Sequence, residues 1–225
     1  MADAMRVVIE IGPKGKRVVA VAQGWPGLSR GAKTEEAAVE RLQEYLPRYA
    51  PVARLAGMGA EFAASAGVEV VERYPGTGST DFWGISFAFS DSDKQPVSGE
   101  ELERELALMG VSWAFFDGVR ARVSAEMRKG PRGGGRDRDR IVRHTFGVER
   151  DWAAGLGVQT SEGAMLTDAG LQTHRDAYRE AIRDFHAQGK MAGKWPLRYL
   201  IRHTAFHTLD HAWEMEDKDL TGSAG

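Results

Sequence analysis

The sequence contains no cysteine among its 225 residues. Disulfide bonds, thiolate metal ligands and a cysteine nucleophile are therefore excluded, and any thiol chemistry needs a thiol from outside the chain. No apolar run approaches the roughly 20 residues that cross a membrane, so no membrane partner is expected. The formal net charge is only −2 at pH 7, and so no overall basic field predicts nucleic acid as a partner.

The first residues also lack the features of a secretory signal. In MADAMRVVIEIG, no charged region precedes a long apolar stretch and a small-residue cleavage site. We therefore expect a cytoplasmic protein. A chain of this length with 42% hydrophobic residues can bury one substantial core or two small ones.

The first part of the chain is typical of a small α+β layer. Four runs rich in β-branched or aromatic residues predict strands, the first two joined as a hairpin by the turn at 12–16. A helix is expected to begin after Thr34, where two glutamates follow a capping residue, and to end near Pro47; residues 52–57 continue it. The predicted strands cover residues 5–12, 17–25, 68–74 and 82–89.

The composition changes at residues 90–101, a polar stretch with a proline that ends in a helix cap at Ser98. We place a domain boundary there, so that the β-β-α-β(β) domain covers residues 1–95. After it, apolar residues recur every three or four positions, which indicates helices with one buried face. Four helices of this length predict an antiparallel four-helix bundle. Their expected ranges are 102–127, 137–156, 168–188 and 195–219.

Half of the six histidines lie within nine residues near the end of the chain. His203, His207 and His211 follow one another at four-residue intervals, which places them in a slowly drifting stripe on one helix face. Such pairs are a known zinc geometry, although neutral imidazoles can also simply fill a helix interface. His144, on the apolar stripe of the second helix, is the expected third ligand. His174 is the competing candidate, with a buried histidine bonded to backbone or water as its alternative.

Two segments resemble the DinB-like, or YfiT-like, metalloprotein superfamily. HTAFHTLDHAWEM (203–215) is similar to the last-helix signature of that family, in which a Gln or Glu follows the final histidine by three residues. IVRHTFGVERDW (141–152) is similar to its second-helix motif, a histidine followed five residues later by Glu. The sequence departs from the commonest pattern at Ala212 and Trp213, which stand where an arginine usually follows the last histidine.

The DinB-like resemblance implies a four-helix bundle over residues 98–222 that binds one divalent metal through three histidines. Carried over position by position, the ligands are His144, His207 and His211, while His203 is a neighbour one turn away.

Two carboxylates lie near these histidines in the sequence. Glu214 follows His207 by seven residues, so it falls on nearly the same helix face. It is expected either to contact the site from behind a ligand or to accept a proton, and the alternative is a solvated carboxylate at the helix end. Glu149 points elsewhere and is expected to pair with an arginine. His186 lies among polar neighbours and is expected to be exposed.

A second resemblance covers the amino-terminal part. AQGWPGLSRGAKTEEAAVERLQEYL (22–46) resembles the HicB-like antitoxin domain, in which a strand ends in a Pro-Gly motif before a helix. The HicB-like resemblance implies a β-β-α-β fold. True antitoxins of this kind bind a small toxin and in some cases DNA, but no helix-turn-helix or ribbon dimer arm is found here, so the fold is inferred without the role.

The connection at 129–140 joins three consecutive glycines to five basic residues. It lacks the lysine-serine ending of a P-loop and the strand that precedes one. One interpretation is a flexible, solvated connection before a capped helix. The other is an anion clamp in which Arg132 and Arg136 hold a carboxylate or phosphate of a substrate.

Three neutral histidines on Zn²⁺ or Ni²⁺ leave the ion close to its full charge, so that it can activate a water or bind a thiolate. The DinB-like resemblance implies a thiol-dependent S-transferase or isomerase, with a hydrolase as a related hypothesis. The thiol would be a low-molecular-weight one such as mycothiol. We expect a small-molecule substrate and consider a homodimer.

Two non-catalytic hypotheses remain. In one, the HicB-like part recognises a protein partner and the metal only stabilises the helical bundle. In the other, the histidines hold no metal and the protein is an interaction module.

Overall fold

The computed structural model describes residues 4–65, 67–131 and 134–221. Within them the fold is mixed α+β, with one four-stranded sheet and ten helices. Contacts divide the chain into two compact units. Unit 1 consists of Met1–Val111 and Ile201–Phe206, and unit 2 of Ser112–Leu200 and His207–Gly225.

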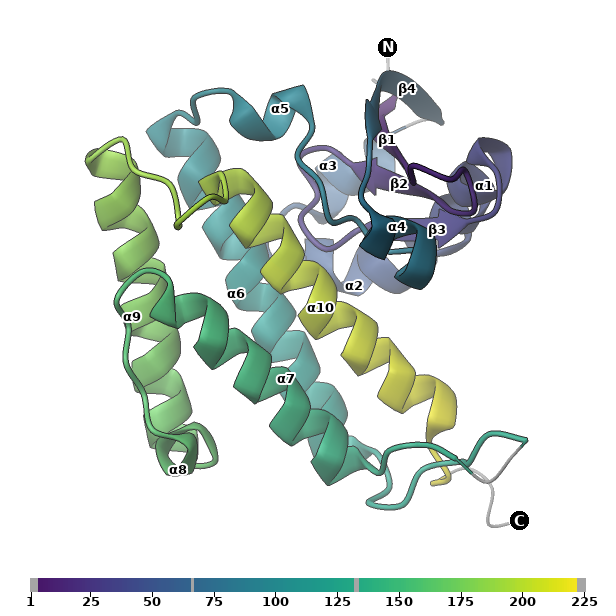
Figure 1. Cartoon of the computed structure of the whole chain (residues 1–225). Helices are drawn as coiled ribbons and strands as arrows, with labels where there is room; N and C mark the ends of the chain where they lie inside the picture. The colour runs from purple at the N-terminus through teal and green to yellow at the C-terminus, as the bar shows by residue number, and fades with distance from the viewer. Residues whose placement is uncertain (1–3, 66, 132–133, 222–225) are drawn as a thin grey trace. The chain divides into compact units, whose positions relative to one another are not determined.

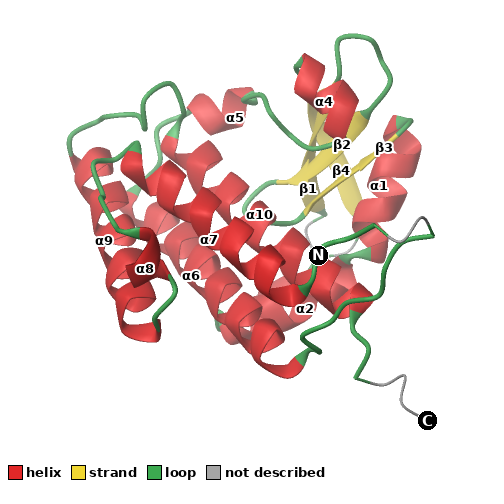
Figure 2. Cartoon of the chain, turned by 60° about the horizontal axis from the view of Figure 1, so that its bottom comes forward, coloured by secondary structure: helices red, strands yellow, loops and turns green. Residues whose placement is uncertain are grey.

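All four strands belong to unit 1 and form one sheet, drawn in yellow in Figure 2. The order is β3-β2-β1-β4, in which β2 pairs antiparallel with both β1 and β3 and β4 runs parallel to β1. The predicted hairpin and the predicted strand at 68–74 are confirmed. The short third strand was not predicted. The strands are β1 (Met5–Ile11), β2 (Val18–Ala22), β3 (Ser29–Ala32) and β4 (Val68–Pro75).

A parallel pair needs a crossover connection, and here helices between β3 and β4 supply it. Thr34 caps the first of them, where its hydroxyl accepts a hydrogen bond from the backbone of Ala37. The second buries Tyr49, whose hydroxyl donates to the carbonyl of Pro26 at 2.8 Å. The helices of this part are α1 (Glu35–Glu44), α2 (Leu46–Leu55), α3 (Gly59–Ala64), α4 (Gly78–Trp83) and α5 (Asp91–Lys94).

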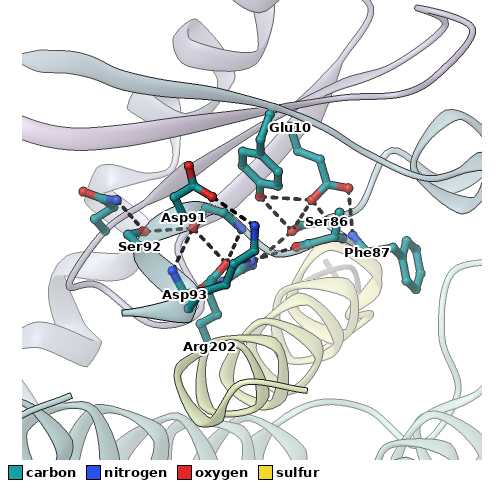
Figure 3. A network of polar contacts seen from close by, with 12 residues as sticks. Glu10, Ser86, Phe87, Asp91, Ser92, Asp93 and Arg202 are labelled. Atoms are coloured by element: carbon teal, nitrogen blue, oxygen red, sulfur yellow. Dashed lines mark hydrogen bonds and ion pairs between the residues drawn. The ribbon is translucent and has the colours of Figure 1, made fainter. Parts of the chain in front are cut away.

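The predicted strand at 82–89 is wrong. Its first residues belong to α4, and the backbone N–H groups of Phe87 and Ala88 donate to the carboxylate of Glu10 at 2.9 and 3.2 Å. Glu10 is fully buried on β1. Because this carboxylate takes both amides, they are not available for a strand ladder (Figure 3). The same carboxylate accepts hydrogen bonds from the hydroxyls of Tyr74, Thr80 and Ser86.

Arg202 extends this network to the segment of α10 that belongs to unit 1 (Figure 3). Its guanidinium donates to both carboxylate oxygens of Asp93 at 2.8 and 2.7 Å and to Ser86 at 3.0 Å. Burial raises the pKa of Asp93, but Arg202 and hydrogen bonds from Ser90 outweigh burial, and the net effect lowers it. Asp93 therefore stays ionised and holds this arginine in place.

The remaining helices are labelled in Figure 1. They lie in unit 2, and α6 and α10 also contribute residues to unit 1. The four predicted helices are present, but α6 ends at Arg122 rather than reaching Met127. The reason is that the N–H of Ser124 donates to the carboxylate of Asp219 at 2.8 Å instead of to a helix carbonyl. The helices are α6 (Gly99–Arg122), α7 (Arg138–Ala154), the unpredicted α8 (Glu162–Met165), α9 (Asp168–Ala187) and α10 (Leu197–Lys218).

A hydrophobic cluster lies in the interior of unit 2, and residues of α6, α7, α9 and α10 contribute to it. Its buried members are Phe116, Val119, Val123, Met127, Ile141, Phe146, Met165, Leu171, Ala212 and Met215.

The polar stretch at 90–101, chosen from the sequence as a boundary, lies inside unit 1. Among the helices of the described residues, none is long and apolar enough to span a membrane.

Candidate metal centre

Three histidines of unit 2 converge from two helices. His144 lies on α7, and His207 and His211 lie one turn apart on α10 (helices in Figure 1). Each offers a ring nitrogen, and these nitrogens all lie within 4.8 Å of one another. The ring of His144 is centred 5.2 Å from that of His207 and 5.0 Å from that of His211. The structure thus brings together the three residues that the sequence predicted as ligands.

A metal ion requires its ligand nitrogens at a defined spacing. Zn–N bonds are about 2.0–2.1 Å long, so a tetrahedral site places two such nitrogens about 3.3 Å apart. The Nε2 atoms of His144 and His207 are 3.3 Å apart. The spacing of this pair and the all-imidazole donor set therefore suit a divalent metal ion.

Solvent access differs across the three rings. His144 is exposed, His207 is half-buried and His211 is buried. Desolvation lowers the pKa of His144, and the charges of His211 and Arg136 lower it further. A lowered pKa favours the neutral imidazole, which is the form that binds a metal. The group is therefore open to solvent at His144, and the neutral form of that imidazole is favoured.

Glu214 lies directly behind His211. Its Oε2 is 2.7 Å from Nδ1 of His211, and Lys218 donates to its Oε1 at 2.6 Å. Burial raises the pKa of Glu214, but the hydrogen bonds from His211 and Lys218, together with the charge of Arg136, outweigh this and lower the pKa to about 2. An ionised carboxylate can only accept hydrogen bonds, so Nδ1 of His211 is the donor in this contact, and Nε2 is the ring nitrogen that remains for a metal.

Arg136 lies at the same end of the group. Its Nη2 donates to Oε2 of Glu214 at 3.0 Å and lies 3.5 Å from Nδ1 of His211. The side chain is partly exposed and has further N–H donors on Nε and Nη1. Arg132, the other residue predicted for an anion clamp, lies outside the described residues.

The remaining histidines are not part of this cluster among the residues described. His174 is buried, and its Nδ1 lies 2.8 Å from the hydroxyl of Thr160, a side-chain partner. His186 is half-buried, not exposed as predicted. His203 belongs to unit 1, where it is buried with its ring 5.7 Å from that of Phe87. Burial, followed by the charge of Arg202, lowers the pKa of His203 to about 3.

Glu149 pairs with an arginine, as predicted. Arg175, on α9, donates to it at 3.0 Å and to Asp117 at 2.6 Å. Glu149 is almost completely buried, and burial raises its pKa despite the arginine. The pair belongs to the interior of unit 2 rather than to the histidine group.

Two tryptophans beside the histidines were not assigned to the site from the sequence. The ring of Trp152 is centred 5.3 Å from that of His207, and the ring of Trp195 is 5.8 Å from Trp152. The only sequence signal is that Trp152 follows His144 by about two helical turns. Lys218 was also missed, although its position four residues after Glu214 is the spacing of a helical ion pair.

Comparison with known proteins gave no relative: no family model, no curated protein and no solved structure matched the chain.

Proposed function

We propose that this chain is a divalent-metal-binding protein of the DinB-like kind that works as a metal-dependent enzyme. In this proposal His144, His207 and His211 hold Zn²⁺ or Ni²⁺, and the helices of unit 2 form an antiparallel four-helix bundle. The observation that carries it is the 3.3 Å separation of Nε2 of His144 and Nε2 of His207. Support for the bundle comes from the shared hydrophobic cluster, to which α6, α7, α9 and α10 all contribute.

An open face favours a catalytic over a purely structural ion. Structural zinc sites are closed by four protein ligands, whereas catalytic sites keep a position for water or substrate. Among the described residues, three histidines meet, and the first is exposed. A divalent ion with three neutral ligands supplies Lewis acidity, which favours loss of a proton from a water or a thiol near neutral pH.

The neighbouring residues then have defined tasks. Glu214 orients His211 through the 2.7 Å contact, and its pKa of about 2 makes it a weak proton acceptor at neutral pH. Arg136 faces the same end, its Nε and Nη1 make no hydrogen bond with the described residues, and it is suited to hold an anionic group of the substrate. Because the chain has no cysteine, a thiol-dependent S-transfer or isomerisation needs an external low-molecular-weight thiol such as mycothiol.

Metal analysis of protein purified without a histidine tag tests the proposal. We expect about one equivalent of Zn²⁺ or Ni²⁺ after loading and dialysis, and loss of tight binding in His144→Ala and in His207→Ala. His186→Ala, on α9 and outside the group, is the matched control and should keep full binding. Less than about a tenth of an equivalent in the wild-type protein, unchanged after adding either ion, would refute the metal site.

Turnover is tested separately, with the metal-loaded protein and a panel of electrophiles in the presence and absence of thiols. We expect turnover that disappears in His144→Ala and persists in His186→Ala. The opposite result is a metal-loaded protein that turns over no substrate and retains a bound protein partner through purification. That result would favour the hypothesis of a non-catalytic binding protein in which the metal only stabilises the bundle.

A further inference from the structure

A row of aromatic rings leads away from one of the three histidines. Trp152, on α7, meets His207 edge to face with ring centres 5.3 Å apart. Trp195 continues the row at 5.8 Å from Trp152, and Tyr199 follows at 5.0 Å from Trp195. Tyr199 is fully buried, whereas both tryptophans are only half-buried. The two indoles therefore form a partly exposed apolar surface next to a candidate metal ligand.

This surface and the charged groups lie at opposite ends of the histidine group. Along α10, Tyr199 and His207 precede His211, and Glu214 with its partner Arg136 follows it. Each residue advances about 1.5 Å along the helix, so His207 and Glu214 are separated by about 10 Å along the axis. The order along the helix is thus aromatic rings, ring nitrogens, then carboxylate and guanidinium.

Simple shielding of His207 from water would need no second indole. Indole is a large apolar surface, and partly exposed tryptophans next to polar groups are typical of binding surfaces rather than of cores. The row reaches beyond Trp152 to Trp195, and neither indole is fully buried.

We propose that the ligand of this site carries an aromatic or other planar apolar group beside its metal-binding group, and that Trp152 and Trp195 hold the apolar part. The inference rests on the proposed metal site and adds the substrate class to it. The distance along α10 limits the ligand to a compact molecule, with its apolar part at the indoles and any anionic part at Arg136.

Two hydroxamates that share a metal-binding group test this inference. Benzohydroxamate and acetohydroxamate differ in the phenyl ring, and their dissociation constants for the zinc-loaded full chain can be measured by calorimetry. We expect the wild-type protein to bind benzohydroxamate about tenfold more tightly. Trp152→Ala should remove most of this preference, while its zinc content and its affinity for acetohydroxamate stay unchanged.

Two further variants keep the test informative. Trp152→Phe retains a ring and should retain most of the preference even if the alanine variant folds poorly. Trp83→Ala removes an exposed tryptophan of unit 1 and should leave both affinities unchanged. Equal affinity of the two hydroxamates, or a preference that survives in Trp152→Ala, would overturn the aromatic subsite while the metal site stands. Failure of the wild-type protein to take up zinc would instead overturn the metal site, and the subsite with it.

Discussion

Replacing Glu214 by Gln separates its role behind His211 from every role in direct contact with a metal. The substitution preserves the shape of the side chain and removes its charge. In the wild-type protein the carboxylate accepts from Nδ1 of His211 at 2.7 Å and is flanked by Lys218 and Arg136. A glutamine amide can turn its NH₂ towards Nδ1, which would favour the tautomer with its proton on Nε2, the atom needed for the metal.

The expected loss of zinc affinity can be taken from similar contacts in other metalloproteins. Loss of a group that orients a metal-binding histidine typically lowers metal affinity tenfold to a hundredfold, or about 1.4–2.8 kcal/mol. Removal of the carboxylate also leaves two cationic side chains without their shared partner. We therefore expect Glu214→Gln to bind zinc more weakly by a factor within this range, without losing the site altogether.

Competition with a chromophoric chelator measures this affinity directly. Glu216→Gln is the matched control, because Glu216 lies two residues further along α10 and pairs with Arg122. It should bind zinc like the wild-type protein. Unchanged affinity in Glu214→Gln, or an equal loss in both variants, would refute the orienting role.

Three further predictions concern the interior of the two units. Glu10→Gln should lower the free energy of unfolding by about 3 kcal/mol in chemical denaturation, because one amide oxygen cannot serve all the donors that meet the carboxylate; an unchanged midpoint would contradict this. Glu149→Ala should cost about 3 kcal/mol by the same assay, since it leaves Arg175 buried with one carboxylate fewer, and a loss below about 1 kcal/mol would show that the pair is dispensable. Burial, helped by Arg175, lowers the pKa of His174 to about 4 from an unfolded value of 6.5, so its contribution to stability is complete above pH 6.5 and is lost as the pH falls towards 4. His174→Gln should therefore unfold with a shallower dependence on pH between 6.5 and 4.5, and an identical pH dependence would contradict the assignment.

Much of the architecture follows from local patterns. The hairpin at the start of the chain and the long helices were predicted because alternation and three-to-four spacing are properties of neighbouring residues. The alignment of His207 and His211 followed from the helical period on α10. His144 was chosen because it was expected on the apolar stripe of the second helix, but the structure shows it exposed, beside the buried residues Ile141 and Thr145 of α7. The charged residues around the histidines were harder to predict, because Arg136 and Glu214 are 78 residues apart in the sequence.

The errors come from contacts between distant parts of the sequence. Residues 82–89 have the composition of a strand, but Glu10, a polar residue in an otherwise apolar run, captures two of their amides. Likewise, α6 ends early because Asp219, 95 residues further on, accepts the hydrogen bond of Ser124. In both cases a carboxylate accepts backbone N–H groups that the local sequence would place in a strand or a helix. The carboxylate and these N–H groups are too far apart in the sequence for a short window to contain both.

In the proposed site, imidazoles from α7 and α10 bind one cation together. X-ray absorption at the zinc or nickel edge of the loaded, tag-free protein tests it most directly. We expect three imidazole nitrogens at about 2.0–2.1 Å from the ion, falling to two in His144→Ala. A shell made of oxygen alone, or one that His144→Ala leaves unchanged, would contradict the account.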